Sequence, residues 1–334
     1  MQVKAIRAHA NGGPEVLRWE DHELAPPATG EVLVRHAAIA LNYSDINVRR
    51  GGFYIAKPVR FPLVLGNEAT GTVEALGAGV TGFAIGDRVA YVGSGGPFYE
   101  DTGSYAEARC VPASCLVPLP SDQPDDLVAA SLMKALTAAL VITVLCRPRP
   151  GDRVLVHGAA SGVGLLLVQW AKHLGATVLG TVGSKEKAEL ARANGCDHPI
   201  LYRDEDFVAA VKRIAPKGVD AVLDGVGKDT FIPSFDCTRR YGQLVNYGNA
   251  SGHVPPFDLL LLAKKGSLSV SRAGVTSLVG SAEELRAASA TVFERMREGV
   301  LRPHLGARYA LKDAATAHRD LEARRIAGAA VLIP

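Results

Sequence analysis

The stretch VLVHGAASGVG, residues 154–164, has the residue types of a phosphate-binding turn. An apolar run typical of a buried strand leads into small residues, and Val163 is the only large side chain in the turn before the last glycine. At the start of a helix, backbone N–H groups have no carbonyl partner within the helix and lie at the positive end of its dipole. A turn without bulky side chains lets an anion reach these groups, so the stretch predicts a phosphate or pyrophosphate site.

The turn departs from the usual dinucleotide-binding pattern G-x-G-x-x-G. It has Ala159, Ser161 and Gly164 at the three small positions. A tight turn of this kind can also serve only to pack a helix against a sheet. The strand before it, the helix after it and the alternating elements that follow favour the pyrophosphate site of a dinucleotide.

The end of the second strand in this region indicates which dinucleotide binds. An Asp or Glu there would accept hydrogen bonds from the ribose 2′-hydroxyl of NAD. Here the sequence is GTVGSKEK, with Gly183 at the acidic position, followed by Ser184 and Lys187. A hydroxyl, a lysine and the N–H groups of that turn would hold a 2′-phosphate, so NADP(H) is favoured over NAD(H); Ser184 would also be a helix N-cap. Tyr202, at the end of the third strand, is either an adenine contact or a generic buried aromatic.

A repeated strand and helix pattern surrounds these residues from residue 153 onward. The expected strands are RVLVHG, ATVLGTVG, HPILYR, VDAVLDGVG, GQLVNYG and SLSVSR. The expected helices follow the first four strands, at residues 162–175, 184–195, 204–215 and 229–240. This alternation is typical of βαβ units, so it predicts a doubly wound α/β domain, with helices on both faces of a parallel sheet.

The sequence before residue 125 predicts a different architecture. EVLVRHAAIALN, TGTVEALGAGV and GDRVAYVG are strand-like and are separated by Gly- and Pro-rich turns, with little helical periodicity. We expect a mostly antiparallel β domain over residues 1–124 and the α/β domain over 125–272. Residues 273–334, with helices near 281–298 and in the tail and a final strand, are too few to fold alone and are expected to return to the first domain.

The composition excludes several classes of partner. The 334 residues are 48% hydrophobic, with a net charge of only +3 and no basic block. A nucleic-acid or membrane-surface binder would carry such a block, so neither partner is expected and small neutral or anionic ligands are favoured.

Three features favour a cytoplasmic protein. The N-terminal segment MQVKAIRAHANGG has no apolar region of an export signal. The five cysteines are scattered, with no CxxC pair, as expected of reduced thiols that pack in a core. The apolar segment 127–146 approaches the length of a membrane span, but Lys134 and Thr137 lie in it, so we interpret it as a buried helix.

Several segments of the chain resemble a known family. GTVEALGAGVTGFAIGDRVAY, GAASGVGLLLVQWAKHLGATVLGTVGSKEKAELARANG, VNYGNASG, GSLSVSR and LEARRIAGAAVLIP are similar to the zinc-independent quinone oxidoreductases, or zeta-crystallin-like proteins, of the medium-chain dehydrogenase/reductase superfamily. The resemblance implies a GroES-like catalytic domain, a Rossmann domain and NADPH as the cofactor. It also implies transfer of a hydride to a quinone or related electron-poor enone, and homodimers formed through the last Rossmann strand, SLSVSR.

The resemblance also implies that no metal takes part. Zinc-dependent relatives have a Cys ligand before an SD pair, a His in a GHE motif and a cluster of four cysteines. Here the first two positions are Asn42 in LNYSD and Asn67 in GNEATG, and the cysteine cluster is missing. Neutral amides are poor zinc ligands, so no metal site is expected.

Family cofactor contacts carry over to the positions whose motifs match. Asn42 is expected beside the nicotinamide, Lys134 and Thr137 near its ribose, and Tyr247 and Asn249 against the ring. The remaining contacts are implied at the pyrophosphate and adenosine end: Ser161, Gly162, Val163, Gly183, Ser184, Lys187, Tyr202 and Arg324.

Hydride transfer to a quinone or enone creates negative charge on the acceptor oxygen, so the site needs a hydrogen-bond donor there. Tyr54 in RRGGFY is our candidate donor, assisted by Asn42. The stretch from Asn42 to Tyr54 is one residue longer than the family pattern, so either Phe53 or Tyr54 takes the family's tyrosine position. The loop 92–107 is also longer than usual and is expected to influence acceptor choice.

Two other functions remain open. The motifs SDIN, FY and GNE also resemble enoyl-thioester reductases of the same superfamily, whose substrates need a basic entrance, for which Arg49, Arg50, Lys57 and Arg60 are candidates. The second alternative is an NADPH-binding protein without turnover.

Overall fold

The computed structural model describes residues 1–51, 60–93 and 102–334, which form two compact units. Unit 1 comprises Met1–Met133, Val279–Phe293 and His304–Pro334, and unit 2 comprises Lys134–Leu278 and Glu294–Pro303. The boundary between the units therefore lies inside a helix that begins at Asp125. The boundary predicted from the sequence lies just before this helix. The boundaries at 124 and 272 stay predictions.

Unit 2 is built around a six-stranded sheet, in which all pairings are parallel. The strand order is β11-β10-β9-β12-β13-β14. The strands are β9 (Arg153–His157), β10 (Thr177–Val182), β11 (His198–Leu201), β12 (Val219–Asp224), β13 (Thr238–Asn246) and β14 (Ser269–Arg272). The doubly wound parallel sheet predicted from the sequence is confirmed.

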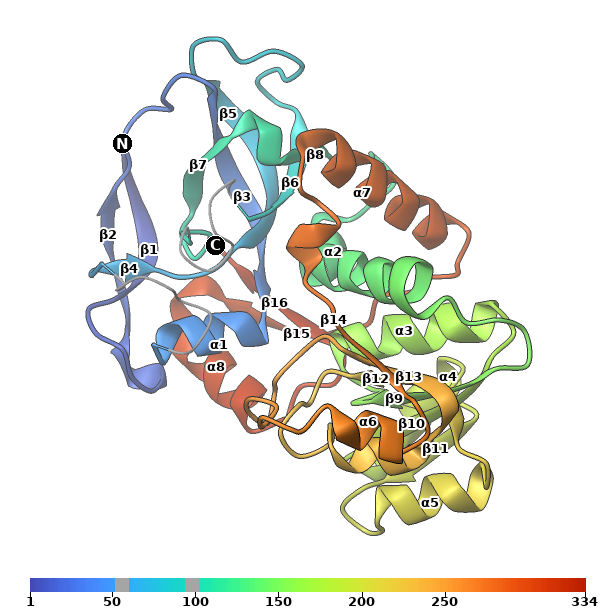
Figure 1. Ribbon diagram of the computed structural model, residues 1–334. Coiled ribbons are helices and arrows are strands. Elements are labelled where there is room, and N and C mark those ends of the chain that lie inside the picture. The colour runs from blue at the N-terminus through green and yellow to red at the C-terminus, as the bar shows by residue number, and fades with distance from the viewer. Residues whose placement is uncertain (52–59, 94–101) are drawn as a thin grey trace. The chain divides into compact units, whose positions relative to one another are not determined.

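The strand order also determines which face of the sheet is covered by each of the helices that connect β9 to β12. The helices are α3 (Gly162–His173), α4 (Lys185–Ala193), α5 (Phe207–Ile214) and α6 (Leu260–Lys264). The connections through α3 and α4 run in one direction along the sheet, and the connection through α5 runs back past β9. Right-handed crossovers then place α3 and α4 on one face and α5 on the other (Figure 1).

One predicted helix of unit 2 is wrong. The sequence pattern predicts a helix over residues 229–240, but only Pro233–Cys237 is helical, as a 3₁₀ turn, and β13 begins at Thr238. Pro233 has no N–H to donate, so it can begin a helical turn and cannot continue a helix that began before it. The apolar residues Phe231 and Phe235 are buried in the core of unit 2, which explains the amphipathic pattern.

Unit 1 contains two sheets that are antiparallel except for one pair of strands. A small sheet has the order β2-β1-β4, and a larger one has the order β15-β16-β3-β5-β6-β8, with β7 paired to β3. Among the described strands of these two sheets, only β15 and β16 pair in parallel. The strands are β1 (Gln2–Ala8), β2 (Leu17–Glu23), β3 (Glu31–Leu41), β4 (Leu63–Val64), β5 (Glu68–Leu76), β6 (Arg88–Val92), β7 (Ala108–Pro112), β8 (Leu116–Pro118), β15 (Leu305–Ala310) and β16 (Ala329–Ile333). Because β16 pairs with β3, the C-terminal segment is part of the N-terminal sheet.

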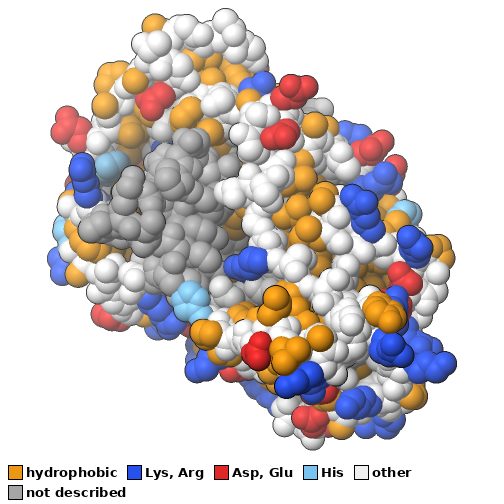
Figure 2. Space-filling model, viewed as in Figure 1, with side chains coloured by type: hydrophobic (Ala, Val, Ile, Leu, Met, Phe, Trp, Pro, Cys, Tyr) orange, Lys and Arg blue, Asp and Glu red, His pale blue; other side chains and the backbone are white. Residues whose placement is uncertain are grey.

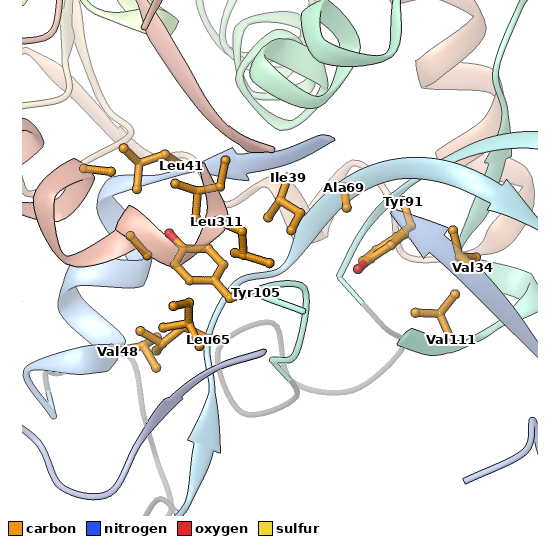
Figure 3. Packing of buried hydrophobic residues seen from close by; sticks show 14 of the residues in the cluster. Val34, Ile39, Leu41, Val48, Leu65, Ala69, Tyr91, Tyr105, Val111 and Leu311 are labelled. Carbon is orange, nitrogen blue, oxygen red and sulfur yellow. The ribbon is translucent and has the colours of Figure 1, made fainter. Parts of the chain in front are cut away.

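Helices α1 (Tyr43–Arg49) and α8 (Ala314–Glu322) lie in unit 1. Helix α7 (Ala282–Arg297) begins in unit 1 and ends in unit 2. Short 3₁₀ turns cover Pro14–Val16, Ala113–Cys115, Val275–Ser277 and Leu311–Asp313. The helix expected near 281–298 is confirmed as α7. Figure 3 shows the core of unit 1, where Leu41, Leu65 and Leu311 surround the ring of Tyr105.

The long apolar helix is part of the folded core. It consists of α2 (Asp125–Ala139) and a π-helical continuation, Leu140–Cys146. This helix is long and apolar enough to cross a membrane, but 72% of its apolar window is buried inside the protein. A buried core helix accounts for its hydropathy, as the sequence indicates.

Candidate active site

The turn between β9 and α3 exposes the start of a helix in unit 2. Gly158 follows β9 with a φ of +69°, a left-handed conformation that favours glycine. Ser161 caps α3 by accepting a hydrogen bond from the Gly164 N–H at 3.1 Å. The N–H groups of Gly162 and Val163, the first two helical residues, have no carbonyl partner within the helix. They are the donors that a phosphate would meet.

Small residues are required where this turn folds on itself. A Cβ on Gly164 would lie 2.1 Å from the Gly158 carbonyl oxygen. A Cβ on Gly180, in β10, would lie 2.5 Å from the Cβ of Ala159. The turn therefore packs tightly against α3 and β10. Ser161, within the turn, is exposed. This arrangement fits a pyrophosphate group, which needs close approach to the backbone.

A chain of hydrogen bonds holds His157, the last residue of β9, beneath the turn. The Ser234 hydroxyl donates to the Thr230 carbonyl at 2.6 Å, so it must accept from His157 Nε2–H, which lies 2.9 Å away. Nδ1 is then the acceptor for the hydroxyl of Thr181, 3.0 Å away, and this hydroxyl accepts the Gly158 N–H. Burial lowers the pKa of His157, in keeping with this neutral tautomer.

The end of β10 leads into the capped start of α4, where the sequence predicts a 2′-phosphate site. Ser184 is the N-cap of α4 and accepts the N–H of Lys187 at 3.3 Å. A Cβ on Gly183 would lie 2.8 Å from the hydroxyl oxygen of Tyr202, which is 37% exposed. An acidic side chain at Gly183 would therefore have to displace Tyr202, so the two residues together disfavour the usual NAD contact.

Three further polar residues, which are not among the residues predicted from the sequence, lie at the ends of neighbouring strands. Asp224 ends β12 and accepts hydrogen bonds from the Gly227 N–H, the Thr230 hydroxyl and the Asn246 amide. Asn246 ends β13, and its Oδ1 accepts from Arg272, which ends β14. Ligands of parallel α/β sheets bind at these carboxyl ends, so a polar last residue on successive strands is the signal that could have found them.

Tyr247 and Asn249, expected against the nicotinamide, follow β13 in unit 2. The ring of Tyr247 fills the space beside Gly225, where a Cβ would lie 2.6 Å from a ring carbon. Its hydroxyl donates to the His157 carbonyl at 3.4 Å. Burial, followed by the Asp224 charge, raises the pKa of Tyr247, so the phenol stays protonated.

Lys134 and Thr137 lie on the part of α2 that belongs to unit 2. They are three residues apart and share a helix face, with Lys134 buried and Thr137 half-buried. Arg324 follows α8 in unit 1 and is exposed, with a φ of +57°. Phe53 and Tyr54 lie outside the described residues, as do Lys57 and much of the loop 92–107. These assignments stay predictions.

In unit 1, a buried hydrogen-bond network fixes Asn42. This residue follows β3 and is the N-cap of α1. Its Nδ2 donates to Glu68 Oε2 at 2.9 Å, and its backbone N–H donates to Asp45 Oδ2 at 2.9 Å. The other Glu68 oxygen, Oε1, accepts the N–H of Met133 at 2.7 Å. Asn42 is thus held through both its side chain and its backbone.

The Asp45 carboxylate is connected to Arg49 through two neutral side chains. Arg49 Nη1 can only donate, so it donates to His318 Nδ1, 2.9 Å away. His318 then carries its proton on Nε2 and donates to the Tyr105 hydroxyl, which in turn donates to Asp45 Oδ2; both distances are 3.0 Å. All four side chains are almost fully buried, so this directed relay joins α1 to the C-terminal helix α8.

The residues at the positions of zinc ligands do not fit a zinc ion. The Asn42 amide donates a hydrogen bond to Glu68. The Asn67 side chain is buried, and neither of its amide atoms makes a hydrogen bond to a residue that the structure describes. Within residues 1–51, 60–93 and 102–334, no group of three or more His, Cys, Asp or Glu side chains could hold a metal ion. The amides are poor zinc ligands in any case.

Two known families match successive parts of the chain. Residues 28–121 match the alcohol dehydrogenase GroES-like domain, and residues 162–294 match the zinc-binding dehydrogenase family. Despite the second description, this chain has amides at both catalytic ligand positions. The chain therefore matches the family, but its side chains at these two positions are poor zinc ligands.

Full-length relatives support a more specific comparison. The chain is 42% identical to a quinone oxidoreductase of Pseudomonas aeruginosa, over 99% of this chain and 100% of that protein. It is 38% identical to a 2-haloacrylate reductase of a Burkholderia species, over 99% of both. Its structure is similar to that of an Escherichia coli quinone oxidoreductase complexed with NADPH, with a TM-score of 0.93, 38% identity and coverage of 99% and 100% of the two chains.

Because two histidines of unit 1 are buried, we expect the protein to become less stable against unfolding as the pH falls. Burial lowers the pKa of His318 to about 3, aided by Arg49, and lowers that of His36 to about 4. Below pH 6.5 the unfolded chain binds protons at these positions and the folded protein does not, so lowering the pH favours unfolding. Between pH 7.5 and 5.0 each residue should reduce the free energy of unfolding by about 2 kcal/mol, measured by urea titration at both pH values.

The variant His318→Gln separates this effect from other titrations. Glutamine can accept from Arg49 and donate to Tyr105 but does not titrate, so the pH-dependent loss should shrink by about 2 kcal/mol. The exposed His173 provides the matched control, and His173→Gln should leave the loss unchanged. An equal pH dependence in His318→Gln and the wild type would contradict the neutral, buried state of His318.

Proposed function

This chain belongs to the quinone oxidoreductase family of the medium-chain dehydrogenase/reductases, and from this membership we propose that it reduces quinones or related electron-poor enones with NADPH, without a metal. The observation that supports the proposal is the turn of small residues at Gly158–Gly164 before α3, combined with the Ser184 cap of α4, at which Lys187 lies. The E. coli relative, whose structure contains NADPH, supports the same cofactor here.

The cofactor-binding residues of unit 2 have distinct proposed roles. The N–H groups of Gly162 and Val163, with the Ser161 cap, bind the pyrophosphate. Ser184 and Lys187 bind the 2′-phosphate, and Gly183, beside the Tyr202 hydroxyl, leaves no acidic side chain to repel it. The roles that the sequence implies for Lys134, Thr137, Tyr202, Tyr247 and Asn249, and for Arg324 of unit 1, are proposed as well.

When bound, NADPH supplies a hydride, and the acceptor needs one further proton to complete a two-electron reduction. A donor aimed at the acceptor oxygen is worth about 3–4 kcal/mol of transition-state stabilisation in enzymes of other classes. We propose Tyr54 for this role, with Phe53 as the alternative occupant of the tyrosine position. Asn42, fixed by Glu68 and Asp45, is proposed to orient the nicotinamide end of the cofactor.

An acceptor screen tests the proposed function. Oxidation of NADPH and NADH should be followed with a small quinone, a 2-haloacrylate and crotonyl-CoA, in the wild type and in Tyr54→Phe. We expect NADPH oxidation with the quinone or the haloacrylate, and lower turnover in Tyr54→Phe without a change in NADPH affinity. Preference for crotonyl-CoA would favour an enoyl-thioester reductase, and tight NADPH binding without turnover on any acceptor would favour the non-catalytic alternative.

We also propose a cytoplasmic homodimer that forms through β14. This strand is at the edge of the sheet, and three of its four residues, including Val270, are exposed. Exposed Leu259 and Leu260 lie nearby in the sequence at the start of α6, where Figure 2 shows hydrophobic side chains among charged ones. The five free cysteines are in keeping with a reducing compartment.

Light scattering tests the dimer. We expect a mass of twice the 35.1 kDa chain for the wild type. The variant Val270→Lys places a charge on the edge strand, which opposes strand pairing, and should give the mass of one chain. A monomeric wild type would contradict the proposal.

Removal of the Lys187 amine tests the cofactor assignment. Lys187→Ala should weaken NADPH binding by about tenfold or more, because a charge-assisted contact with the 2′-phosphate is lost, and should leave NADH binding nearly unchanged. Lys185, exposed in the same helical turn, supplies the control variant Lys185→Ala, which should change neither affinity. Equal weakening of NADPH and NADH binding would contradict the phosphate role.

A further inference from the structure

Thr181, on β10, holds the first two N–H groups of the turn that follows β9. Its hydroxyl accepts the Gly158 N–H at 3.2 Å, and its carbonyl accepts the Ala159 N–H at 3.0 Å. Thr181 lies opposite His157 in the parallel pairing of β10 with β9, and both side chains are buried. The N–H groups of Gly158 and Ala159 are therefore directed at β10 and are not available to a ligand.

These two bonds determine which N–H groups of the turn an anion can meet. Further along the turn, the Ser161 N–H donates to the Gly158 carbonyl at 2.9 Å, and the Gly164 N–H donates to the Ser161 hydroxyl. The N–H groups of Gly162 and Val163 lie between these bonded groups, at the start of α3. Because the turn is held at Gly158, the direction of these two donors depends on the hydrogen bond made there.

The Thr181 hydroxyl is itself aligned by a buried chain of hydrogen bonds. It donates to His157 Nδ1 at 3.0 Å, and His157 Nε2–H donates to the Ser234 hydroxyl at 2.9 Å. Ser234 donates to the Thr230 carbonyl at 2.6 Å, which fixes the direction of the whole chain. A hydroxyl has one proton and two lone pairs. Because the Thr181 proton points at His157, a lone pair faces the Gly158 N–H.

We propose that Thr181, aligned through His157 and Ser234, is a positioning residue for the pyrophosphate of the cofactor, which it affects through the turn without touching it. This inference rests on the proposed function, which places the pyrophosphate at the N–H groups of Gly162 and Val163. An anion binds more tightly to donors that are already directed at it, because less free energy is lost in ordering them. Without the Thr181 hydroxyl, the turn stays folded but its donors are less well directed.

Three affinities test the inference without measuring turnover. Titration calorimetry gives the dissociation constants of NADPH, NADH and 2′-AMP for the wild type and for Thr181→Val, which replaces the hydroxyl with a methyl group of similar size. NADPH and NADH share the pyrophosphate, so both constants should rise by the same factor, about fivefold. The nucleotide 2′-AMP has the 2′-phosphate but no pyrophosphate, so its constant should not change. Unchanged NADPH and NADH constants, or an equal loss of 2′-AMP affinity, would overturn the inference.

Two further variants show whether the aligned hydroxyl is the cause. Thr181→Ser keeps the hydroxyl and should bind all three nucleotides as the wild type does. Ser234→Ala removes the acceptor of His157 Nε2–H, so the NADPH and NADH constants should rise together, by less than in Thr181→Val. A Thr181→Ser variant as weak as Thr181→Val contradicts the inference. If Thr181→Val does not fold, Ser234→Ala decides: a parallel rise supports the inference, and unchanged constants overturn it.

Controls separate the inference from a general loss of packing and from the proposed function. Thr70→Val removes a buried hydroxyl in unit 1, which donates to the Asp125 carbonyl at 3.1 Å, and should leave all three constants unchanged. The same rise in Thr70→Val as in Thr181→Val would overturn the inference. A wild type that binds neither NADPH nor NADH refutes the proposed function, whereas a wild type that binds NADPH and does not respond to Thr181→Val refutes only the role of Thr181.

Discussion

Hydrogen bonds of buried polar side chains at strand ends hold the chain in place in both units. In unit 1, Asn42 follows β3 and Glu68 begins β5, and in unit 2, His157, Asp224 and Asn246 end neighbouring parallel strands. Each is almost fully buried, where an unpaired polar group would cost about 1–3 kcal/mol. Their hydrogen bonds therefore hold the strand ends, and the loops that follow, in one arrangement. Asn42, the turn that follows His157 and Tyr247 lie at these fixed ends.

The elements that support the site follow from local patterns, which explains why most of them could be predicted. The parallel strands of unit 2 are short, apolar and β-branched, and the helices between them end at glycines such as Gly175 and Gly195. The Ser161 and Ser184 caps are also local, since each accepts an N–H three residues later. Where a local signal was misleading, at residues 229–240, burial of Phe231 and Phe235 in the core had produced a helical pattern without a helix.

The networks beneath the site could not be predicted because their partners are far apart in the sequence. His157 depends on Ser234, 77 residues away, and Tyr105 on His318, 213 residues away. Composition and spacing do not reveal such pairs, which arise only when strands and helices pack. The same holds for Glu68: its place in GNEATG is visible, but its bond to Asn42 depends on the register of β3 and β5. The assignments of Tyr54 and Phe53 rest on the family resemblance alone.

The two carboxylates that hold Asn42 act on different parts of it. Asp45 is connected to the Arg49 guanidinium through Tyr105 and His318, so its negative charge lies at one end of a relay whose other end is positive. Glu68 accepts from the Asn42 amide and from the Met133 N–H, so it fixes the end of the amide that faces β5, whereas Asp45 fixes the backbone at the start of α1.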